Sequence, residues 1–406
     1  MKRTAAIICE FNPLHMGHER ILSFARESGA DTVVCIMSGN FVQRGEPAIT
    51  DKYTRARTAI EAGADLVLEL PMPYSAASAE YFAFAGVSIA DRLGCVDDLV
   101  FGSESGDISE LSKIAENQLS KEFQNELKNL YSGDMGYAVA AQSAYEKIFG
   151  SSPALKTPNN ILAIEYIKAL RLRSSSIRPL TISREDNFLS EELAEGYPSA
   201  TALRKAVFDG DFEKIGEKMN TAAYETLLCA KEEGTFPVDM KKYSFCLYSF
   251  MRMADPEHLV GCEGMGGGLE NRIVLAALES TDENEFLEKL STKKYTDARI
   301  RRTLLAGILG VTHEDMKTEP PYVNLLAANE KGRELLSAIR KDSSIAITTR
   351  QADIKKVLEE CPFDQRRSAE RIYEISKRAD ALFTMCLPKP RDAGFFEKMN
   401  PFVANK

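Results

Sequence analysis

Two histidines near the start of the chain, His15 and His18, have residue types and spacing suited to phosphate chemistry. They follow an apolar run over residues 4–9 and a turn at Asn12-Pro13, and they precede residues 19–28, whose apolar side chains recur at helical spacing. The pattern predicts a strand, a loop and a helix that begins at the histidines. A helix N-terminus offers unpaired N–H groups and a partial positive charge to a phosphate. Two imidazoles there can donate hydrogen bonds to phosphate oxygens as charge moves onto them.

Gly17, between the two histidines, lacks a Cβ at a point where a nucleotide would approach the backbone closely. A polar helix cap with incidental histidines is the alternative interpretation of this stretch. A metal site formed by His15 and His18 is disfavoured because no third ligand is evident nearby. The sequence therefore predicts a nucleotide site without a metal held by protein ligands.

A second group, Ser199-Ala200-Thr201-x-x-Arg204, stands at the start of another predicted helix. The hydroxyls of Ser199 and Thr201, the helix N–H groups and the guanidinium of Arg204 together can hold an anion. Taken alone the pattern is weak, since Ser and Thr at a helix start usually act as N-caps. Its presence beside the histidine stretch in an α/β domain favours a role in phosphate binding.

Several single residues lie where predicted strands end or helices begin, which is where open α/β sheets bind ligands. Gln43 and Arg44 lie in a loop after a strand, and a plain surface loop is the alternative for them. Gly102 ends a strand, where it would allow the close approach of a base or ribose, and the alternative is an ordinary turn glycine. The remaining candidates are Asn159 and Asn160, which start a helix and could simply cap it, and Arg184, which follows a strand.

A basic stretch in the second half, residues 293–302, contains five cations, one carboxylate and a tyrosine. This composition is typical of a contact with an RNA backbone, although a solvated helix face is the alternative. The predicted RNA-binding residues are Lys293, Lys294, Arg299, Arg301 and Arg302.

The elements that must position these residues alternate between strand and helix in the first half of the chain. Strands are predicted at residues 4–9, 31–37, 64–70, 98–101 and 177–182, with helices between them, which indicates right-handed βαβ units and a parallel sheet. Beyond residue 215 helix is predicted to follow helix, at residues 221–233, 240–253, 270–289, 297–309, 330–340 and 366–386. The expected architecture is α/β, with a Rossmann-like domain at 1–215 and a mainly helical domain at 216–406.

The composition is that of an ordinary globular protein, with 44% hydrophobic and 27% charged residues among 406. The net charge of −9 argues against indiscriminate binding of nucleic acid but allows a local basic patch. The eight cysteines are scattered without a Cys-x-x-Cys pair, and no signal peptide or membrane-spanning run is recognisable. We therefore expect a cytoplasmic protein with reduced thiols and no membrane partner.

The longer stretches around these residues resemble a known family. The histidine and serine patterns resemble the two motifs of the HxGH nucleotidylyltransferase superfamily, and the full set is similar to the bacterial tRNA(Met) cytidine acetate ligase family over most of the chain. The matching stretches are Glu10-Phe-Asn-Pro-Leu-His-Met-Gly-His18, Met37-Ser-Gly-Asn-Phe-Val-Gln-Arg-Gly-Glu-Pro47, Leu68-Glu-Leu-Pro71, Phe101-Gly-Ser-Glu104, Pro158-Asn-Asn-Ile-Leu162, Gly268-Leu-Glu-Asn-Arg272 and Tyr295-Thr-Asp-Ala-Arg-Ile-Arg-Arg302.

The resemblance implies an ATP-dependent ligase that makes N4-acetylcytidine at the wobble position of elongator tRNA(Met). Acetate would attack the α-phosphate of ATP, pyrophosphate would leave, and the cytidine amine would take the acetyl group. Mg²⁺ is expected with ATP, without identified protein ligands, and His15 and His18 are the expected catalytic residues. Ala200 stands where many superfamily members have a second serine, which weakens the phosphate role of that motif.

The ATP-binding residues expected from this resemblance and from the second motif are Ile7, Ile8, Cys9, Glu10, Phe11, Asn12, Pro13, Leu14, His15, Met16, Gly17, His18, Glu19, Arg20, Gly102, one or both of Asn159 and Asn160, Arg184, Ser199, Thr201 and Arg204. Two other functions stay open at this point. One is a small-molecule adenylyltransferase that ignores RNA, and the other is an RNA-binding protein that senses a nucleotide without turnover. The oligomeric state is not indicated by the sequence.

Overall fold

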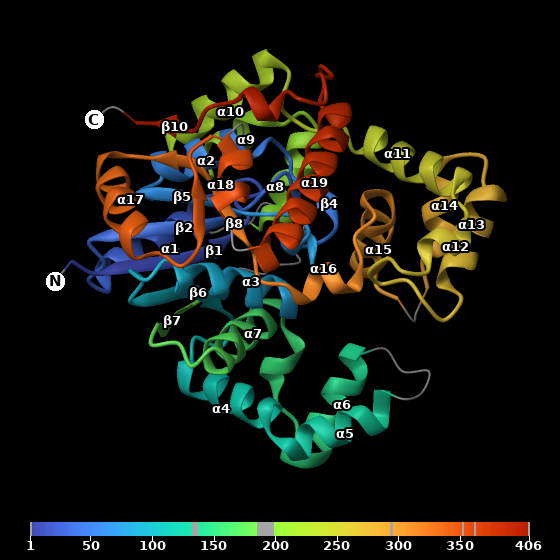
Figure 1. Ribbon diagram of the computed structural model, residues 1–406, viewed down its shortest axis with the longest axis horizontal. Helices are drawn as coiled ribbons and strands as arrows, with labels where there is room; N and C mark the ends of the chain where they lie inside the picture. Colours follow the sequence, from blue (N-terminus) through green and yellow to red (C-terminus); the bar gives the residue numbers. More distant parts are fainter. Residues whose placement is uncertain are drawn as a thin grey trace.

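A mostly parallel sheet, built from both halves of the sequence, forms the centre of the molecule (Figure 1). The computed structural model describes residues 2–131, 137–184, 199–292, 295–350, 353–360 and 363–404. The strands are β1 (Thr4–Cys9), β2 (Thr32–Ser38), β3 (Phe41–Val42), β4 (Glu46–Pro47), β5 (Leu66–Leu70), β6 (Asp98–Ser103), β7 (Arg178–Ser183), β8 (Tyr322–Ala328), β9 (Ala346–Thr348) and β10 (Phe402–Val403).

Helices of the first half cover the sheet or extend away from it. They are α1 (Met16–Glu27), α2 (Lys52–Glu61), α3 (Ala79–Arg92), α4 (Ile108–Leu119), α5 (Lys121–Tyr131), α6 (Tyr137–Phe149), α7 (Pro158–Leu172), α8 (Ala200–Phe208) and α9 (Phe212–Gly216), with the 3-10 turns η1 (Tyr74–Ala76) and η2 (Pro153–Lys156). Figure 1 shows α5 and α6 at one end of the molecule, well away from the sheet.

Helices of the second half form a group beside the sheet and a long helix that returns across it (Figure 1). They are α10 (Thr221–Glu233), α11 (Met240–Met253), α12 (Pro256–Leu259), α13 (Leu269–Leu278), α14 (Glu283–Leu290), α15 (Asp297–Leu309), α16 (His313–Lys317), α17 (Glu330–Asp342), α18 (Ile354–Glu360), α19 (Phe363–Cys386) and the 3-10 turn η4 (Phe396–Lys398).

The strand order in the sheet is β10-β8-β5-β2-β1-β6-β7, with β9 paired to β8. From β5 to β7 all neighbours are parallel, so the carboxyl ends of these strands share one edge. The chain leaves β1 toward β2 on one side and reaches β6 on the other side only later. This reversal of direction at β1 is a topological switch point, which is where ligands bind in open α/β sheets.

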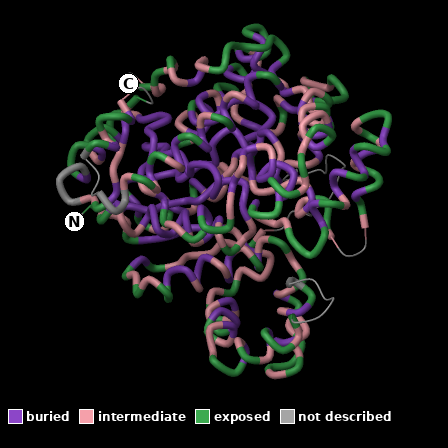
Figure 2. The backbone as a smooth tube through the Cα atoms, turned by 45° about the vertical axis from the view of Figure 1, so that its right-hand side comes forward, coloured by how far each residue is buried: buried purple, intermediate pink, exposed green. Residues whose placement is uncertain are grey.

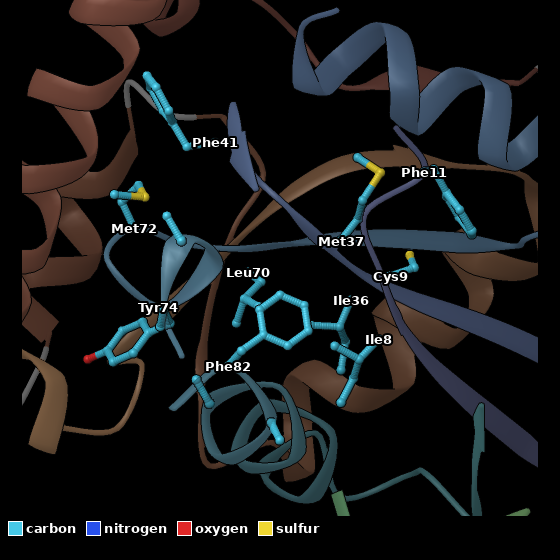
Figure 3. Close-up of a cluster of buried hydrophobic side chains, with 14 of the residues drawn as sticks. Ile8, Cys9, Phe11, Ile36, Met37, Phe41, Leu70, Met72, Tyr74 and Phe82 are labelled. Carbon is cyan, nitrogen blue, oxygen red and sulfur yellow. The ribbon is translucent and has the colours of Figure 1, made fainter. Parts of the chain in front are cut away.

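Complete burial explains why the central strands read as continuous apolar runs. All residues of β1, β2 and β5 are buried, and most of the buried backbone lies at the centre of the molecule in Figure 2. Figure 3 shows the Phe82 ring of α3 beside Leu70, Ile36 and Ile8, which come from three neighbouring strands. Burial of such side chains contributes about 1.5–3 kcal/mol each, and it fixes the strands that carry the site.

The predicted α/β class is confirmed, and so are the strands and most helices expected from periodicity. The helix predicted at 270–289 is wrong as a single element, because it is divided into α13 and α14 and the side chain of Asp282 caps α14. The chain beyond residue 215 is mainly helical as expected, but three strands there were not predicted, since β8, β9 and β10 join the central sheet and β8 runs antiparallel to β5. The division into two domains at residue 215 stays a prediction.

Among the helices of the described residues, none has both the length and the apolar character needed to cross a bilayer.

Candidate functional site

The loop between β1 and α1 places both histidines at the carboxyl edge of the sheet. His15 is fully buried and is the N-cap of α1, with its Nδ1 accepting a hydrogen bond from the N–H of Gly17 at 3.1 Å. Phe11 adopts a φ of +45°, in the left-handed region, which turns the chain sharply out of the strand. We call residues 10–18 the signature segment.

The two imidazoles lie directly against each other. Their ring centroids are 3.8 Å apart, and the edge of Phe11 contacts His18 at 5.1 Å between centroids. Burial, and then the neighbouring His15 and Arg184, lower the pKa of His18 well below its usual value. Its Nδ1 is buried and makes no hydrogen bond with the residues that the structure describes. A neutral ring with an unsatisfied polar atom is suited to a hydrogen bond with a ligand.

The signature segment is fastened to the stretch that follows β2. The fully buried Arg55 donates from Nη1 to the carbonyl of Glu10 at 2.7 Å and from Nε to the carbonyl of Thr50 at 3.1 Å. The N–H of Ile49 donates to Oδ1 of Asn12 at 2.7 Å. These contacts fix the loop before any ligand enters, which lowers the reorganisation needed at the moment of reaction.

Glu10 is the acidic member of this segment. Its Oε1 accepts from the N–H of Gln43 at 2.7 Å. Burial raises the pKa of Glu10, while that hydrogen bond and the guanidinium groups of Arg204, Arg44 and Arg55 oppose the rise. Glu10 therefore lies near three guanidinium groups, of which Arg204 also faces Glu46 and Arg55 also faces Asp51.

The second motif, Ser199 to Arg204, contacts the signature segment. Arg204 donates from Nη1 to the carbonyl of Asn12 at 2.9 Å and from Nη2 to Oγ1 of Thr201 at 3.2 Å. Ser199 caps α8 by accepting from the N–H of Ala202 at 3.0 Å. The structure thus brings the two predicted motifs together, with Arg204 as the link, and Ser199 has the capping role that the sequence offered as its alternative.

The opposite wall of the site comes from β6, β7 and α7. The Arg184 side chain crosses Gly102 so closely that a Cβ at residue 102 would lie 2.7 Å from its Cδ. Arg184 Nη1 donates to Oδ1 of Asn159 at 3.4 Å. Gly102 therefore accommodates an arginine in this structure, and the sequence had assigned it only a close approach to a base or ribose.

Glu104 is a positioning residue that sequence analysis missed. Its carboxylate accepts from the N–H groups of Asn159 at 3.1 Å and Asn160 at 2.7 Å, and from the side chain of Asn159 at 2.8 Å. Asn160 is buried, with Oδ1 accepting from the N–H of Ser105 and Nδ2 donating to Thr157. Of the two asparagines, only Asn159 has its side chain directed to Arg184. The Phe101-Gly-Ser-Glu104 stretch was the available signal for Glu104.

The remaining predicted residues have other partners. Ile7, Ile8 and Cys9 are buried in β1 and paired with β2. Glu19 accepts from the N–H and side chain of Asn220 at 2.9 and 2.8 Å, and Arg20 pairs with Glu27 at 2.8 Å. The peptide bond between Asn12 and Pro13 is cis, Leu14 is buried, and Met16 is exposed with its N–H donating to Lys218.

A buried ionic network lies beneath the stretch after β2. Lys52 Nζ is 2.9 Å from Glu69 and 3.0 Å from Asp380 of α19. Asn40 donates to Asp380 at 2.8 Å and accepts from the N–H of Lys52 at 2.8 Å, while Asn324 of β8 donates to Glu69 at 2.7 Å. Burial alone lowers the pKa of Lys52, but Asp380 and Glu69 raise it above its usual value, so the cation is retained.

The predicted RNA-binding residues divide into three groups. Lys293 and Lys294 lie outside the described residues. Arg299 stacks on the ring of Tyr295 at 4.6 Å. Arg301 and Arg302 instead contact the turn between β3 and β4, where Arg301 pairs with Glu46 and Arg302 donates to the carbonyl of Gln43 at 3.2 Å.

Within the described residues, no group of three or more His, Cys, Asp or Glu side chains has the arrangement of a metal site.

The comparisons with known proteins agree with this geometry. A family model described as HIGH Nucleotidyl Transferase matches residues 1–393. Curated relatives include the tRNA(Met) cytidine acetate ligase of Acetivibrio thermocellus, 36% identical with 97% of each chain covered, and that of Thermoanaerobacter sp., 36% identical with 93% of this chain and 96% of the relative covered. The chain thus has the fold of a HIGH nucleotidyl transferase.

Two solved structures of TmcAL from Thermotoga maritima extend the likeness to three dimensions. The form bound with alpha-thio ATP has a TM-score of 0.91 at 31% identity, and the apo form has a TM-score of 0.93 at 32% identity; each match covers 99% of both chains. The chain belongs to the tRNA(Met) cytidine acetate ligase family.

Proposed function

We propose that this chain is an ATP-dependent ligase that activates acetate as acetyl-adenylate, releases pyrophosphate, and acetylates N4 of the wobble cytidine of elongator tRNA(Met). The observation that carries the proposal is the hydrogen bond from Arg204 to the carbonyl of Asn12, which joins the two nucleotide motifs in one site. The family to which the chain belongs and the alpha-thio ATP bound by the Thermotoga maritima protein support the same function.

The first step needs positioning and charge stabilisation more than covalent help from the protein. An acetate oxygen forms a bond to the α-phosphorus while the bond to the pyrophosphate oxygen breaks and pyrophosphate takes the electron pair. His18 and His15, at the N-terminus of α1, are assigned to the phosphates. Arg204 and Arg184 approach from opposite walls and are assigned to the charge on the leaving group.

The acetate pocket is assigned to the region of Phe11 and the loop at residues 38–45. Two buried polar atoms there, Nε2 of Gln43 and Oγ of Ser38, make no hydrogen bond within the part of the chain that the structure describes. Both can donate to a carboxylate. Because an apolar pocket distinguishes one methylene by only about 1–3 kcal/mol, we assign the exclusion of longer acids to steric closure by Phe11 and this loop.

In the second step the cytidine amine attacks the acetyl carbonyl, AMP leaves, and the amine gives up a proton. We assign tRNA binding to Lys293, Lys294 and Arg299 of the basic stretch, and we propose that Mg²⁺ arrives on the ATP phosphates rather than on a protein site. Cytoplasmic location follows as part of the same proposal, because the tRNA substrate is there.

The test is release of pyrophosphate from ATP, measured with and without acetate and with and without tRNA. The proposal expects acetate-dependent release without tRNA, and acetylated cytidine in tRNA(Met) when tRNA is present. Propionate is the matched control acid and should give much less release. Adenylation of a phosphate-bearing metabolite without any effect of acetate would instead support a small-molecule adenylyltransferase. ATP and RNA binding without turnover would support a sensing protein.

A further inference from the structure

We infer that Arg301 and Arg302 of α15 are positioning residues of the acetate-activating site rather than contacts to the tRNA backbone. They hold the turn between β3 and β4 (the 41–47 hairpin) against the signature segment. The inference rests on the proposed function, because it assigns these arginines a part in the first chemical step.

Both guanidinium groups are directed at the hairpin. Arg301 forms an ion pair with the carboxylate of Glu46, and Arg302 Nη1 donates to the carbonyl of Gln43 at 3.2 Å. The two arginines therefore hold both ends of the turn. Hydrogen bonds that involve a charged group are stronger than those between neutral groups, so the pair can decide where the turn lies.

The backbone of α15 also supports the middle of the turn. Gly45 has a φ of +75°, and a Cβ on it would lie 2.5 Å from the backbone nitrogen of Arg302 and 2.8 Å from the carbonyl carbon of Arg301. The hydroxyl of Tyr243 donates to the carbonyl of Gly45 at 2.6 Å within the core. The turn is thus seated directly on the helix, which only a glycine at this position allows.

The hairpin is linked to the histidines through Glu10 and Phe11. The N–H of Gln43 donates to Oε1 of Glu10 at 2.7 Å, and Glu10 immediately precedes Phe11, whose ring edge contacts His18. The same turn carries Nε2 of Gln43, which is buried without a hydrogen bond to any described residue. A displacement of the turn would therefore move the acetate pocket and the histidines together.

The environment of these arginines is unlike that of an RNA-binding face. Burial lowers the pKa of Arg302, and Arg301 has only 36% of its side chain exposed and is paired. A phosphate would have to displace Glu46 to reach Arg301, with a cost in both the ion pair and the hairpin. Arg299, three residues before Arg302, instead stacks on the ring of Tyr295.

The experiment measures acetate-dependent pyrophosphate release without tRNA in Arg301→Ala and Arg302→Ala. We expect kcat to fall by about 10–100-fold, because a displacement of about 1 Å has effects of that size, while the affinity for ATP alone changes less than threefold. Arg301→Lys should recover most of the rate because it keeps the charge beside Glu46. Arg350→Ala, which removes an exposed arginine paired with Asp353 at 2.9 Å, is the matched control and should behave as wild type.

A double-mutant cycle guards against simple loss of folding. Glu46→Gln should reproduce the effect of Arg301→Gln, and the double variant should be no worse than either single change, since both remove one interaction. Hydrogen exchange of residues 41–47, which needs no turnover, should be faster in Arg301→Gln than in wild type.

The outcomes separate the two claims. If wild type shows no acetate-dependent release, the proposed function fails, and hydrogen exchange alone decides whether the arginines hold the hairpin. If wild type is active and both alanine variants keep tRNA-free release within twofold while tRNA binding falls, the inference is overturned and the arginines belong to the RNA-binding face. Unchanged hydrogen exchange in Arg301→Gln would overturn it as well.

Discussion

The signature segment and α15 are both rich in polar side chains near one site, but they differ in how their residues work. In the signature segment the residues that would touch the ligand lie within nine positions of each other, and the local turn aims them. In α15, Arg301 and Arg302 act on residues more than 250 positions away in the chain. Chemistry is concentrated in the short segment, whereas its placement depends on contacts from the second half of the chain.

The largest expected effect is the loss of an imidazole from the signature segment. His18→Ala should lower acetate-dependent pyrophosphate release by about 10²–10³-fold, because a donor to the developing charge is removed. The measurement is kcat for release without tRNA, and the control is His18→Asn, which keeps a side-chain donor and should retain more activity. Release within threefold of wild type would remove His18 from the chemical step and leave the segment with a binding role only.

The second prediction concerns the buried ionic network around Lys52. Lys52→Met leaves Glu69 and Asp380 buried without their shared cation, so the free energy of unfolding should fall by about 3–5 kcal/mol. The measurement is urea unfolding. The control is Lys2→Met, which removes an exposed pair with Glu334 and should cause no measurable change. If the two variants unfold alike, the network contributes nothing measurable to the free energy of unfolding.

A third prediction separates the remaining basic residues from the two arginines. Replacing Lys293 and Lys294 by alanine should weaken binding to tRNA several-fold and reduce the slope of log affinity against log salt by about 1–2, because two counterion-releasing contacts are lost. Lys355 and Lys356, an adjacent exposed pair in α18, provide the control with the same change in charge. An equal effect of both double variants would indicate general attraction to RNA rather than a specific contact.

The smallest expected effect is a pH dependence of stability that comes from His18. Its pKa is lowered in the folded protein, so between that value and about 6.5 the unfolded chain binds a proton that the folded chain does not. The free energy of unfolding should therefore decrease as the pH falls from 7 to 5. In His18→Gln the free energy of unfolding should decrease less over the same pH range. The measurement is urea unfolding of both proteins at pH 7, 6 and 5. An identical pH dependence in both proteins would contradict the buried, neutral state of His18.

Sequence analysis predicted what depends on local pattern. The strand–loop–helix around His15 and His18 is confirmed, since alternation of apolar runs and turn residues reports it directly. The role of Glu104 at the start of α7 was not predicted, because the stretch at 101–104 marks the residue but does not reveal partners 55 and 56 positions later in the chain. The strand β8 was missed because a short apolar run of seven residues is ambiguous between helix and strand.

The same limit applied to the basic stretch. Residue types alone grouped Arg301 and Arg302 with Arg299 and the two lysines, since charge is visible in a sequence and the direction of a side chain is not. Residue 45 must be glycine because a Cβ there would collide with the backbone of α15, a contact that the sequence does not reveal. The assignment of ATP-binding residues stays a prediction that the geometry supports at His15, His18, Arg184 and Arg204.

The antiparallel pairing of β8 with β5 has a consequence for attempts to divide the molecule. A fragment that ends near residue 215 would lack β8, so one edge of β5 would be unpaired. All five residues of β5, Leu66–Leu70, are buried in the whole chain. The fragment would also lack Asp380 and Asn324, so Lys52 and Glu69 would lose half of their network. An uncovered apolar strand edge is a template for pairing between copies. Self-association would therefore dominate the behaviour of the isolated nucleotide-binding half.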